Sequence, residues 1–346
     1  MRIRAIESLL PSKLVTNDDV IEIVKGYARS SLSDGELEEL EFQIRRLLAV
    51  SDTKVRYHRA PNETALGLGI DVGKAALKKA DIDPSEIDLL IYVGVARGFV
   101  EPATANLFQH HLGLKKATCF DILDACASWL RALHIANLFI TSGTYRNIMI
   151  LNSECNAREY GTFKVSSVED LKFRFPALTI GEAATATIVS PSDVPEPFYF
   201  TFRNWGSGHT LCKIPLPQYR EYCNGDDVTN VNPLEFFSMG EKLFRLGFIK
   251  MMDHYHSDSV IKAYRPDVSF SHSASDSATM RIAKLMGEEK SVVATHARFG
   301  NTVSASIPLG MSYAMREGKM LPNMKVMVGC VSAGLTTGWS CFRYLD

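Results

Sequence analysis

Short apolar runs alternate with longer helical patterns over most of the chain. Five of these runs have the length and composition of buried strands, at residues 89–95, 117–122, 147–152, 184–189 and 325–330. Between them, apolar side chains recur at the three- and four-residue spacing of amphipathic helices. This alternation predicts an α/β fold in which helices cover the sheets.

The first fifty residues depart from this rhythm. Asn17 is placed to cap a helix with apolar residues between 20 and 24, and a second helix starts near Ser33, with leucine and isoleucine at helical spacing from Leu37 to Leu48. We expect residues 17–50 to form a helical cover over another part of the protein.

Three prolines in Ser190-Pro-Ser-Asp-Val-Pro-Glu-Pro197 prevent a continuous element and indicate a seam. The seam divides the chain into halves at 1–192 and 193–346. A weak repeat relates them, because Gly143 follows Cys126 by 17 positions and Gly318 follows Asn301 by 17. Each glycine can end a helix, and an apolar strand follows each. The repeat predicts a duplicated unit in which Cys126 and Asn301 occupy equivalent helix starts.

A cysteine at the start of a helix suits nucleophilic chemistry. The positive end of the helix dipole should favour the Cys126 thiolate, and the small residues of Asp124-Ala-Cys-Ala-Ser128 leave room for a substrate. The alternative is that Cys126 only fills space in the core, as many free cysteines do.

Composition and charge narrow the classes of partner. The 346 residues are 46% hydrophobic and 22% charged, with 38 basic and 39 acidic side chains and a net charge of -1. We therefore expect no nucleic acid and no anionic membrane surface as a partner. The apolar run 89–96 is far shorter than the roughly 20 residues of a membrane helix. The N-terminus has no apolar run typical of a secretory signal, so we expect a cytoplasmic protein.

The sequence contains no motif typical of metal, redox or phosphate-binding sites. The seven cysteines include no Cys-x-x-Cys pair, so free thiols are expected. There is no His-Glu-x-x-His, the segment starting at Asp81 lacks the glycine of a calcium loop, and neither a Gly-x-Ser-x-Gly nor a phosphate-binding glycine loop occurs. We expect no metal and no redox cofactor.

Four motifs in one order carry a resemblance to a known family. They are Asp-Ala-Cys-Ala-Ser around Cys126, Ser-His-Ser-Ala-Ser around His272, Gly-Asn-Thr-Val-Ser-Ala-Ser-Ile-Pro from Gly300 and Ala-Gly-Leu-Thr-Thr-Gly from Ala333. From about Val50 onward the chain resembles the β-ketoacyl-ACP synthase III branch of the thiolase superfamily. The resemblance implies a duplicated thiolase fold in five α-β-α-β-α layers, and a homodimer.

The resemblance also implies a Cys-His-Asn triad at Cys126, His272 and Asn301. A cysteine thiolate can take an acyl group from a thioester and hold it as a new thioester. His272 and Asn301 would donate hydrogen bonds to the second thioester as enolate charge develops, and the N–H groups of Cys126 and Gly334 would bind the other oxyanion. The alternatives are a satisfied histidine at 272 and a helix cap at 301.

One position departs from the family pattern. Before Pro102 the family commonly has an apolar residue that reaches across the dimer, and here it is Glu101. A desolvated carboxylate there could act as a general base. In this feature the chain resembles stand-alone ketosynthases that form α-pyrones or related rings in secondary metabolism. The alternative is a displaced loop in which Glu101 is solvated.

The sequence thus predicts a ketosynthase that joins two acyl thioesters by a Claisen reaction through an acyl group on Cys126. Substrates are expected on acyl carrier protein or coenzyme A, and by resemblance Arg174 could lie near the coenzyme A phosphates. Three alternatives remain open: a decarboxylative synthase III of fatty-acid initiation, an acyltransferase of the same fold that uses an alcohol or amine, and an inactive partner subunit.

Overall fold

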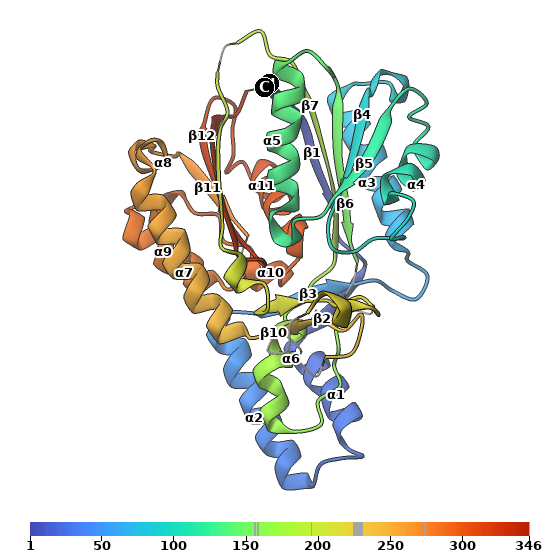
Figure 1. The fold of residues 1–346 in the computed structure, drawn as a ribbon, viewed down its shortest axis with the longest axis vertical. Helices are drawn as coiled ribbons and strands as arrows, with labels where there is room; N and C mark the ends of the chain where they lie inside the picture. The colour runs from blue at the N-terminus through green and yellow to red at the C-terminus, as the bar shows by residue number, and fades with distance from the viewer. Residues whose placement is uncertain (156, 158, 195, 224–230, 273, 346) are drawn as a thin grey trace.

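Two sheets with helices between them and on both outer sides organise the chain in five layers (Figure 1). The computed structural model describes residues 1–155, 157, 159–194, 196–223, 231–272 and 274–345. The predicted α/β class and the five layers are confirmed.

The first sheet has the strand order β1-β7-β6-β4-β5. Its strands are β1 (Arg2–Leu9), β4 (Leu89–Val93), β5 (Thr118–Ile122), β6 (Ile148–Glu154) and β7 (Ala183–Ser190). β4, β5 and β6 run parallel, whereas β7 is antiparallel to both β1 and β6. All residues of β6 and β7 are buried because helices cover both faces, which explains their nearly continuous apolar sequences.

The second sheet repeats this arrangement with the strand order β11-β12-β13-β8. Its strands are β8 (Tyr199–Asn204), β11 (Val268–Ser271), β12 (Lys325–Ser332) and β13 (Thr336–Arg343). β11 and β12 are parallel and the other pairs are antiparallel. A parallel bridge between Ser269 and Val292 lies where the first sheet has β5. The shared order and directions confirm the predicted duplication.

Two helices, α5 (Ser128–Thr141) and α11 (Ser306–Arg316), form the central layer between the sheets (Figure 1). Every residue of α11 from Ser306 to Ala314 is buried, so this helix carries apolar or small residues on all sides. The outer helices are α3 (Ala65–Ala80) and α4 (Thr104–His111) on the first sheet, and α7 (Gly240–Ser257), α8 (Ser259–Ala263) and α9 (Asp276–Met286) on the second.

The predicted helical cover is present as α1 (Asn17–Ala28) and α2 (Asp34–Val50) at the lower end of Figure 1. Both pack against α6 (Leu171–Leu178) through one apolar cluster. Ser33 caps α2 as expected, but the N-cap of α1 is Thr16 rather than Asn17. Asn17 instead donates to the Thr53 carbonyl at 2.8 Å.

The remaining short elements connect these layers: β2 (Lys13–Thr16), β3 (Val55–His58), β9 (Cys212–Lys213), β10 (Phe237–Ser238) and α10 (His296–Phe299). Within the described ranges, no helix combines the length and the apolar character that crossing a membrane requires.

Candidate active site

Cys126 lies in a single 3-10 turn, Ala125–Ala127, that leads into the central helix α5. Ala125 has a φ of 43°, so the backbone bends sharply just before the cysteine. The Ser128 hydroxyl donates to the Ala125 carbonyl at 2.7 Å and holds this bend. A residue outside the common backbone regions persists only when its surroundings fix it, and such residues gather at functional sites.

The second central helix starts in the same way, but its equivalent of Cys126 is Ser304. Val303 has a φ of 51°, and the Ser306 hydroxyl donates to the Val303 carbonyl at 2.9 Å. Ala-Cys-Ala-Ser in one half therefore matches Val-Ser-Ala-Ser in the other. The prediction that Cys126 and Asn301 occupy equivalent helix starts is wrong, because α11 has 11 residues and α5 has 14, so the glycines after them are out of register.

Asn301 lies in an extended segment before the Val303 turn. Its N–H donates to the Thr179 carbonyl at 2.8 Å, and its carbonyl accepts from the Gly181 N–H at 3.0 Å. Its side-chain Oδ1 accepts from the Val303 N–H at 3.0 Å. Because the amide oxygen is used in this way, the side-chain NH2 group of Asn301 is left as the donor for a substrate.

His272 directly follows β11, and its N–H donates to the Gly329 carbonyl of β12 at 3.1 Å. Its Nδ1 lies 3.2 Å from the Ser306 hydroxyl, and a hydrogen bond links its ring to the Val303 backbone. Burial lowers the pKa of His272 to about 4, and His296 acts in the same direction. The imidazole is therefore neutral at neutral pH and can accept a proton.

The end of β12 brings the predicted triad together. The turn with Cys126 contacts β12, β13 and the Val303–Ala305 turn. Ser332 of β12 accepts from the Ala127 N–H at 3.3 Å and donates to the Asp124 carbonyl at 2.9 Å. The same strand binds His272, and Val303 binds both His272 and Asn301, so Cys126, His272 and Asn301 converge on one place.

The protonation of Cys126 differs from the sequence prediction. Burial raises the pKa of the Cys126 thiol well above its usual value, and Cys330, Cys212 and Glu154 act in the same direction. Burial therefore raises the pKa of Cys126 more than the helix dipole lowers it. The expectation of a favoured thiolate is wrong for the resting protein. Cys126 must lose its proton as it attacks, and neutral His272 is the base at hand.

Two backbone N–H groups complete this place. Gly334 lies in the turn between β12 and β13, with a φ of 131°. In the described part of the chain, the Gly334 N–H has no backbone acceptor, and the Cys126 N–H has only the sulfur of its own side chain. Both can therefore turn to a developing oxyanion, the role that the sequence predicts for them.

Glu101 is not brought to the triad within one chain. It is exposed in the loop between β4 and α4, and it forms no hydrogen bond or ion pair with any residue that the structure describes. Phe99 and Val100 beside it are 42% and 81% exposed. The side chains of this loop are therefore open to solvent in the single chain.

Arg174 is also apart from the triad, on α6. Its guanidinium pairs with the Glu235 carboxylate at 2.9 Å, so a ligand phosphate would have to compete with this ion pair. The assignment of Arg174 to coenzyme A stays a prediction.

Sequence reasoning missed two residues of this region, Glu154 and Ser304. Glu154 ends β6, is fully buried and binds the hydroxyl of Ser304 at 2.6 Å. An acid at the end of a strand that begins with four apolar residues is unusual and was the available signal. For Ser304 the signal was the direct match of Val-Ser-Ala-Ser at 303–306 with Ala-Cys-Ala-Ser at 125–128.

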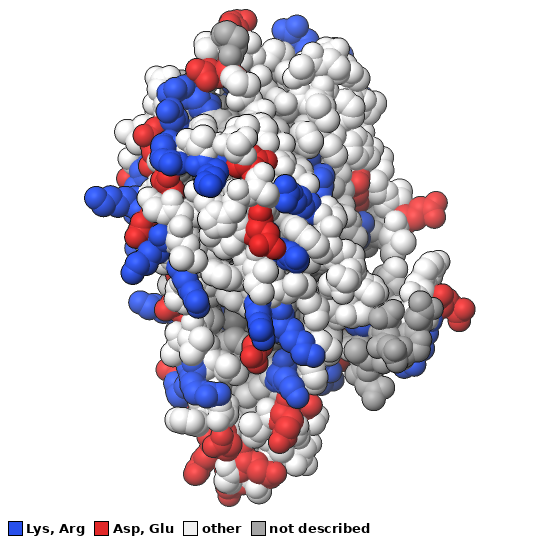
Figure 2. All heavy atoms as spheres, turned by 60° about the vertical axis from the view of Figure 1, so that its left-hand side comes forward, with Lys and Arg blue, Asp and Glu red and all other residues white. Residues whose placement is uncertain are grey.

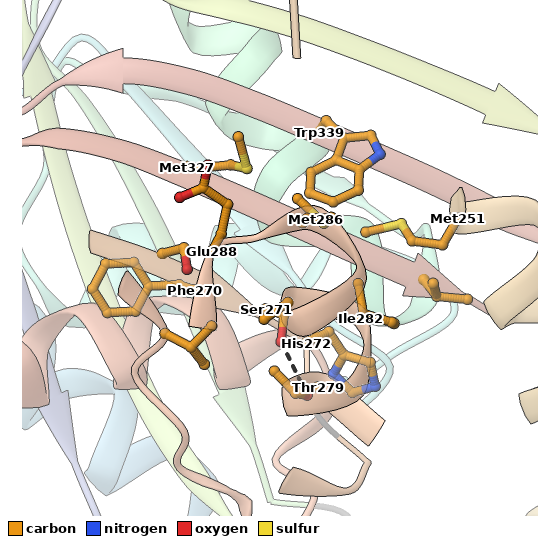
Figure 3. Close-up of a pocket in the computed structure, with 15 residues that line it drawn as sticks. Met251, Phe270, Ser271, His272, Thr279, Ile282, Met286, Glu288, Met327 and Trp339 are labelled. Carbon is orange, nitrogen blue, oxygen red and sulfur yellow. Dashed lines mark hydrogen bonds between the residues drawn. The ribbon is translucent and has the colours of Figure 1, made fainter. Parts of the chain in front are cut away.

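A cavity of about 70 Å³ lies on the outer face of the second sheet, under α9 (Figure 3). Its wall is mostly apolar, with three methionines, Met251, Met286 and Met327, and with His272 and Glu288 among its polar residues. Of the predicted site residues in the described part of the chain, only His272 lines it. Methionine walls adapt readily to the shape of an apolar group.

Charges of both signs cover the face in Figure 2, with acidic side chains at its lower end, where α1 and α2 lie. Among the residues described, no group of three or more His, Cys, Asp or Glu side chains is arranged to hold a metal ion.

Two family models match separate segments of the chain. Residues 120–204 match the family described as 3-oxoacyl-[acyl-carrier-protein] synthase III, and residues 261–344 match its C-terminal family. The two matches include Cys126, Arg174, His272, Asn301 and Gly334. They do not include Glu101.

Solved structures extend the likeness to the whole fold. A 3-oxoacyl-[acyl-carrier-protein] synthase III from Aquifex aeolicus VF5 has a TM-score of 0.80 at 23% identity, over 99% of each chain. OleA from Xanthomonas campestris, solved with lauric acid and lauroyl-CoA, has a TM-score of 0.82 at 18% identity, over 99% of this chain and 98% of that one. The chain thus has the thiolase fold. In both halves it is similar to 3-oxoacyl-[acyl-carrier-protein] synthase III.

Proposed function

We propose that this protein is a ketosynthase that joins two acyl thioesters by a Claisen condensation, with the first acyl group held on Cys126. The observation that carries this proposal is the convergence of Cys126, neutral His272 and the Asn301 amide at the end of β12. The matches to synthase III support it.

The first step is an acyl transfer. The sulfur of Cys126 attacks the thioester carbonyl, its proton passes to His272, and the carrier thiolate leaves with that proton. The N–H groups of Cys126 and Gly334 stabilise the oxyanion. One C–S bond forms and one breaks, so the exchange is nearly neutral in free energy, and tethering the acyl group makes the next step effectively unimolecular.

The second step forms the carbon–carbon bond. The second thioester loses its α-proton to a general base, or a carboxylate as CO2. His272 and the Asn301 NH2 group donate hydrogen bonds to its carbonyl, which stabilises the enolate. The enolate carbon attacks the acyl group on Cys126, and the cysteine leaves as thiolate. An acyltransferase to an alcohol or amine would have little use for Asn301.

In the finer form of the proposal, the second substrate is a 3-oxoacyl thioester, Glu101 removes its α-proton, and the product cyclises to an α-pyrone or related ring. Substrates arrive on acyl carrier protein or coenzyme A. OleA, solved with lauroyl-CoA, also has structures with a glutamate, a histidine or a cysteine replaced, the residue types of the site proposed here.

The finer form needs a homodimer, because Glu101 is exposed on the single chain and a general base must be enclosed with its substrate. Two features favour a partner on this side. The loop carries exposed Phe99 and Val100, and β5 lies at the edge of its sheet. An unpaired strand edge is a ready site for association.

Acyl transfer to Cys126 is the test of the proposed function. Wild-type protein and Cys126→Ala are incubated with lauroyl-CoA, and intact mass is measured. We expect one lauroyl group on the wild type and none on the variant. Cys330→Ala serves as a matched control, because Cys330 is also buried nearby and should not affect labelling. A variant without Cys126 that still carries the acyl group would overturn the proposal.

A further inference from the structure

Glu154 is a fully buried carboxylate that the proposed chemistry does not use. It ends β6, and in the described ranges it pairs with no lysine or arginine. A buried charge without a counter-ion is costly unless hydrogen bonds replace its hydration. The donors of those hydrogen bonds therefore show which segments of the chain the carboxylate keeps in place.

Its hydrogen bonds come from two separate segments. Oε1 accepts from the Val95 N–H at 3.0 Å and from the Ser304 hydroxyl at 2.6 Å, while Oε2 accepts from the Ala96 N–H at 3.0 Å. The fit is close, because a Cβ on Gly94 would lie 2.7 Å from Oε1. The loop after β4 and the turn before α11 thus meet on one side chain.

The direction of the serine hydrogen bond is fixed by Asn152. Its Oδ1 accepts from the Thr185 N–H at 3.1 Å, so its Nδ2 must donate to the Ser304 oxygen, also at 3.1 Å. The Ser304 hydrogen is then directed to Glu154. Burial raises the pKa of Glu154, and the hydrogen bonds from Ser304, Ala96 and Val95 act against this shift because they favour the ionised carboxylate.

Each segment leads to a residue of the proposed site. Ser304 follows Val303, whose backbone binds His272 and the Asn301 side chain. Val303 is β-branched and has a φ of 51°, a strained conformation that needs such anchors. The Val95–Ala96 segment is the stem of the loop that carries Glu101.

We propose that Glu154 is a positioning residue: it holds the Val303 turn, and through it the His272 imidazole, in register with Cys126, and it sets the stem of the Glu101 loop. This inference rests on the proposed function. It adds a residue that touches neither substrate nor the reacting atoms but on which the alignment of the two catalytic segments depends.

The charge of Glu154 also affects the pKa of Cys126. Together with burial, and with Cys330 and Cys212, its charge raises the pKa of the thiol. Burial raises the pKa of Cys212 to about 11 and raises that of Cys330 further, so neither thiol is ionised at neutral pH. Glu154 is the carboxylate of the set, and its removal should lower the pKa of Cys126.

The test compares Glu154→Gln and Ser304→Ala with wild type by two measurements. One is the pH midpoint of Cys126 alkylation by iodoacetamide, followed by intact mass. The other is the condensation rate after Cys126 is loaded with lauroyl-CoA. We expect Glu154→Gln to lower the midpoint and to slow condensation about 10- to 100-fold. Ser304→Ala keeps the charge, so it should slow condensation and leave the midpoint unchanged.

Glu182→Gln is the matched control. Glu182 is equally buried, but it accepts from the Arg59 N–H at 2.6 Å and pairs with the Arg59 guanidinium, and its recorded hydrogen bonds go to Arg59 and Ala157 rather than to the Val303 turn. We expect it to leave the alkylation midpoint unchanged. Equal midpoints for Glu154→Gln and wild type, or condensation at the wild-type rate by Ser304→Ala, would overturn the inference.

Two further results would each have a definite meaning. If Glu154→Gln does not fold, the condensation rate of Ser304→Ala decides. If wild-type Cys126 takes up no acyl group, the proposed function fails and the positioning role falls with it. The alkylation midpoints, which need no acyl substrate, still show whether Glu154 acts on Cys126.

Discussion

At the scale of single residues, burial sets the protonation states of both Cys126 and His272. The thiol must start protonated and the imidazole must start unprotonated, and burial favours the neutral form of each. Burial raises the pKa of the thiol and lowers that of the imidazole to about 4. The resting site thus holds a protonated sulfur beside an unprotonated base, and the proton can move when a thioester binds. Motifs predicted both residues, but not these states, because hydration is lost only when distant segments close over them.

Glu101→Gln tests the general base, also at the residue scale. The variant should acquire a lauroyl group on Cys126 as wild type does, since acylation needs no α-proton removal. Condensation with a 3-oxoacyl thioester should fall about 100-fold or more, the usual contribution of a general base. The two steps are followed by intact mass and by product mass spectrometry.

Glu317→Gln is the control for Glu101→Gln, because Glu317 is an exposed glutamate just after α11. It should behave as wild type in both steps. Undiminished condensation by Glu101→Gln would show that another group removes the proton or that the substrate loses CO2 instead.

At the scale of elements, sequence patterns predicted strands well where helices cover both faces. β4, β6 and β7 are fully buried, and their apolar runs were evident. β13 was missed although nearly all of it is buried, because threonine, glycine and serine separate its apolar residues Trp339, Cys341 and Phe342 so that they form no long run. β13 is buried because helices from other parts of the chain cover its sheet, and the sequence of the strand itself does not show this.

Gly300→Ala tests the segment that presents Asn301. Gly300 has φ 68° and ψ -163°, a region open essentially to glycine alone, and a Cβ there would lie 2.6 Å from the Thr179 carbonyl. We expect a loss of about 2–4 kcal/mol in the free energy of unfolding, measured with urea, because strain and overlap add. Asn301 should shift with the backbone, so condensation should also slow.

Gly318→Ala provides the comparison for Gly300→Ala. Its φ is 66°, but nothing lies within 4 Å of the added Cβ. We expect it to cost only the strain, about 1 kcal/mol. Equal costs at the two positions would mean that the close contact of Gly300 with Thr179 does not hold the segment.

At the scale of the whole molecule, duplication explains both what the sequence predicted and where it failed. The glycines after α5 and α11 indicated the repeat, but one helix is shorter, so counting back from them paired Cys126 with Asn301. The shared bends at Ala125 and Val303 give the true register. Symmetry therefore places Ser304 opposite Cys126, while Asn301 lies in the extended segment before the Val303 turn.

The duplicated architecture also explains how residues from both halves form one site. The central helices pack between the sheets, so the bends before them meet near the middle of the molecule (Figure 1). Cys126 and Glu154 come from the first half, and His272, Asn301 and Ser304 come from the second. Pairings at such sequence separation cannot be read from local periodicity, and only the family motifs indicated them.

A pulse–chase experiment tests the central claim most directly. Cys126 is loaded with radiolabelled lauroyl-CoA, excess reagent is removed, and an unlabelled 3-oxoacyl-CoA is added. The label should leave the protein and appear in a product that contains both acyl chains joined by a carbon–carbon bond. Recovery of the label only as free lauric acid, or its retention on Cys126 while product forms, would contradict the account.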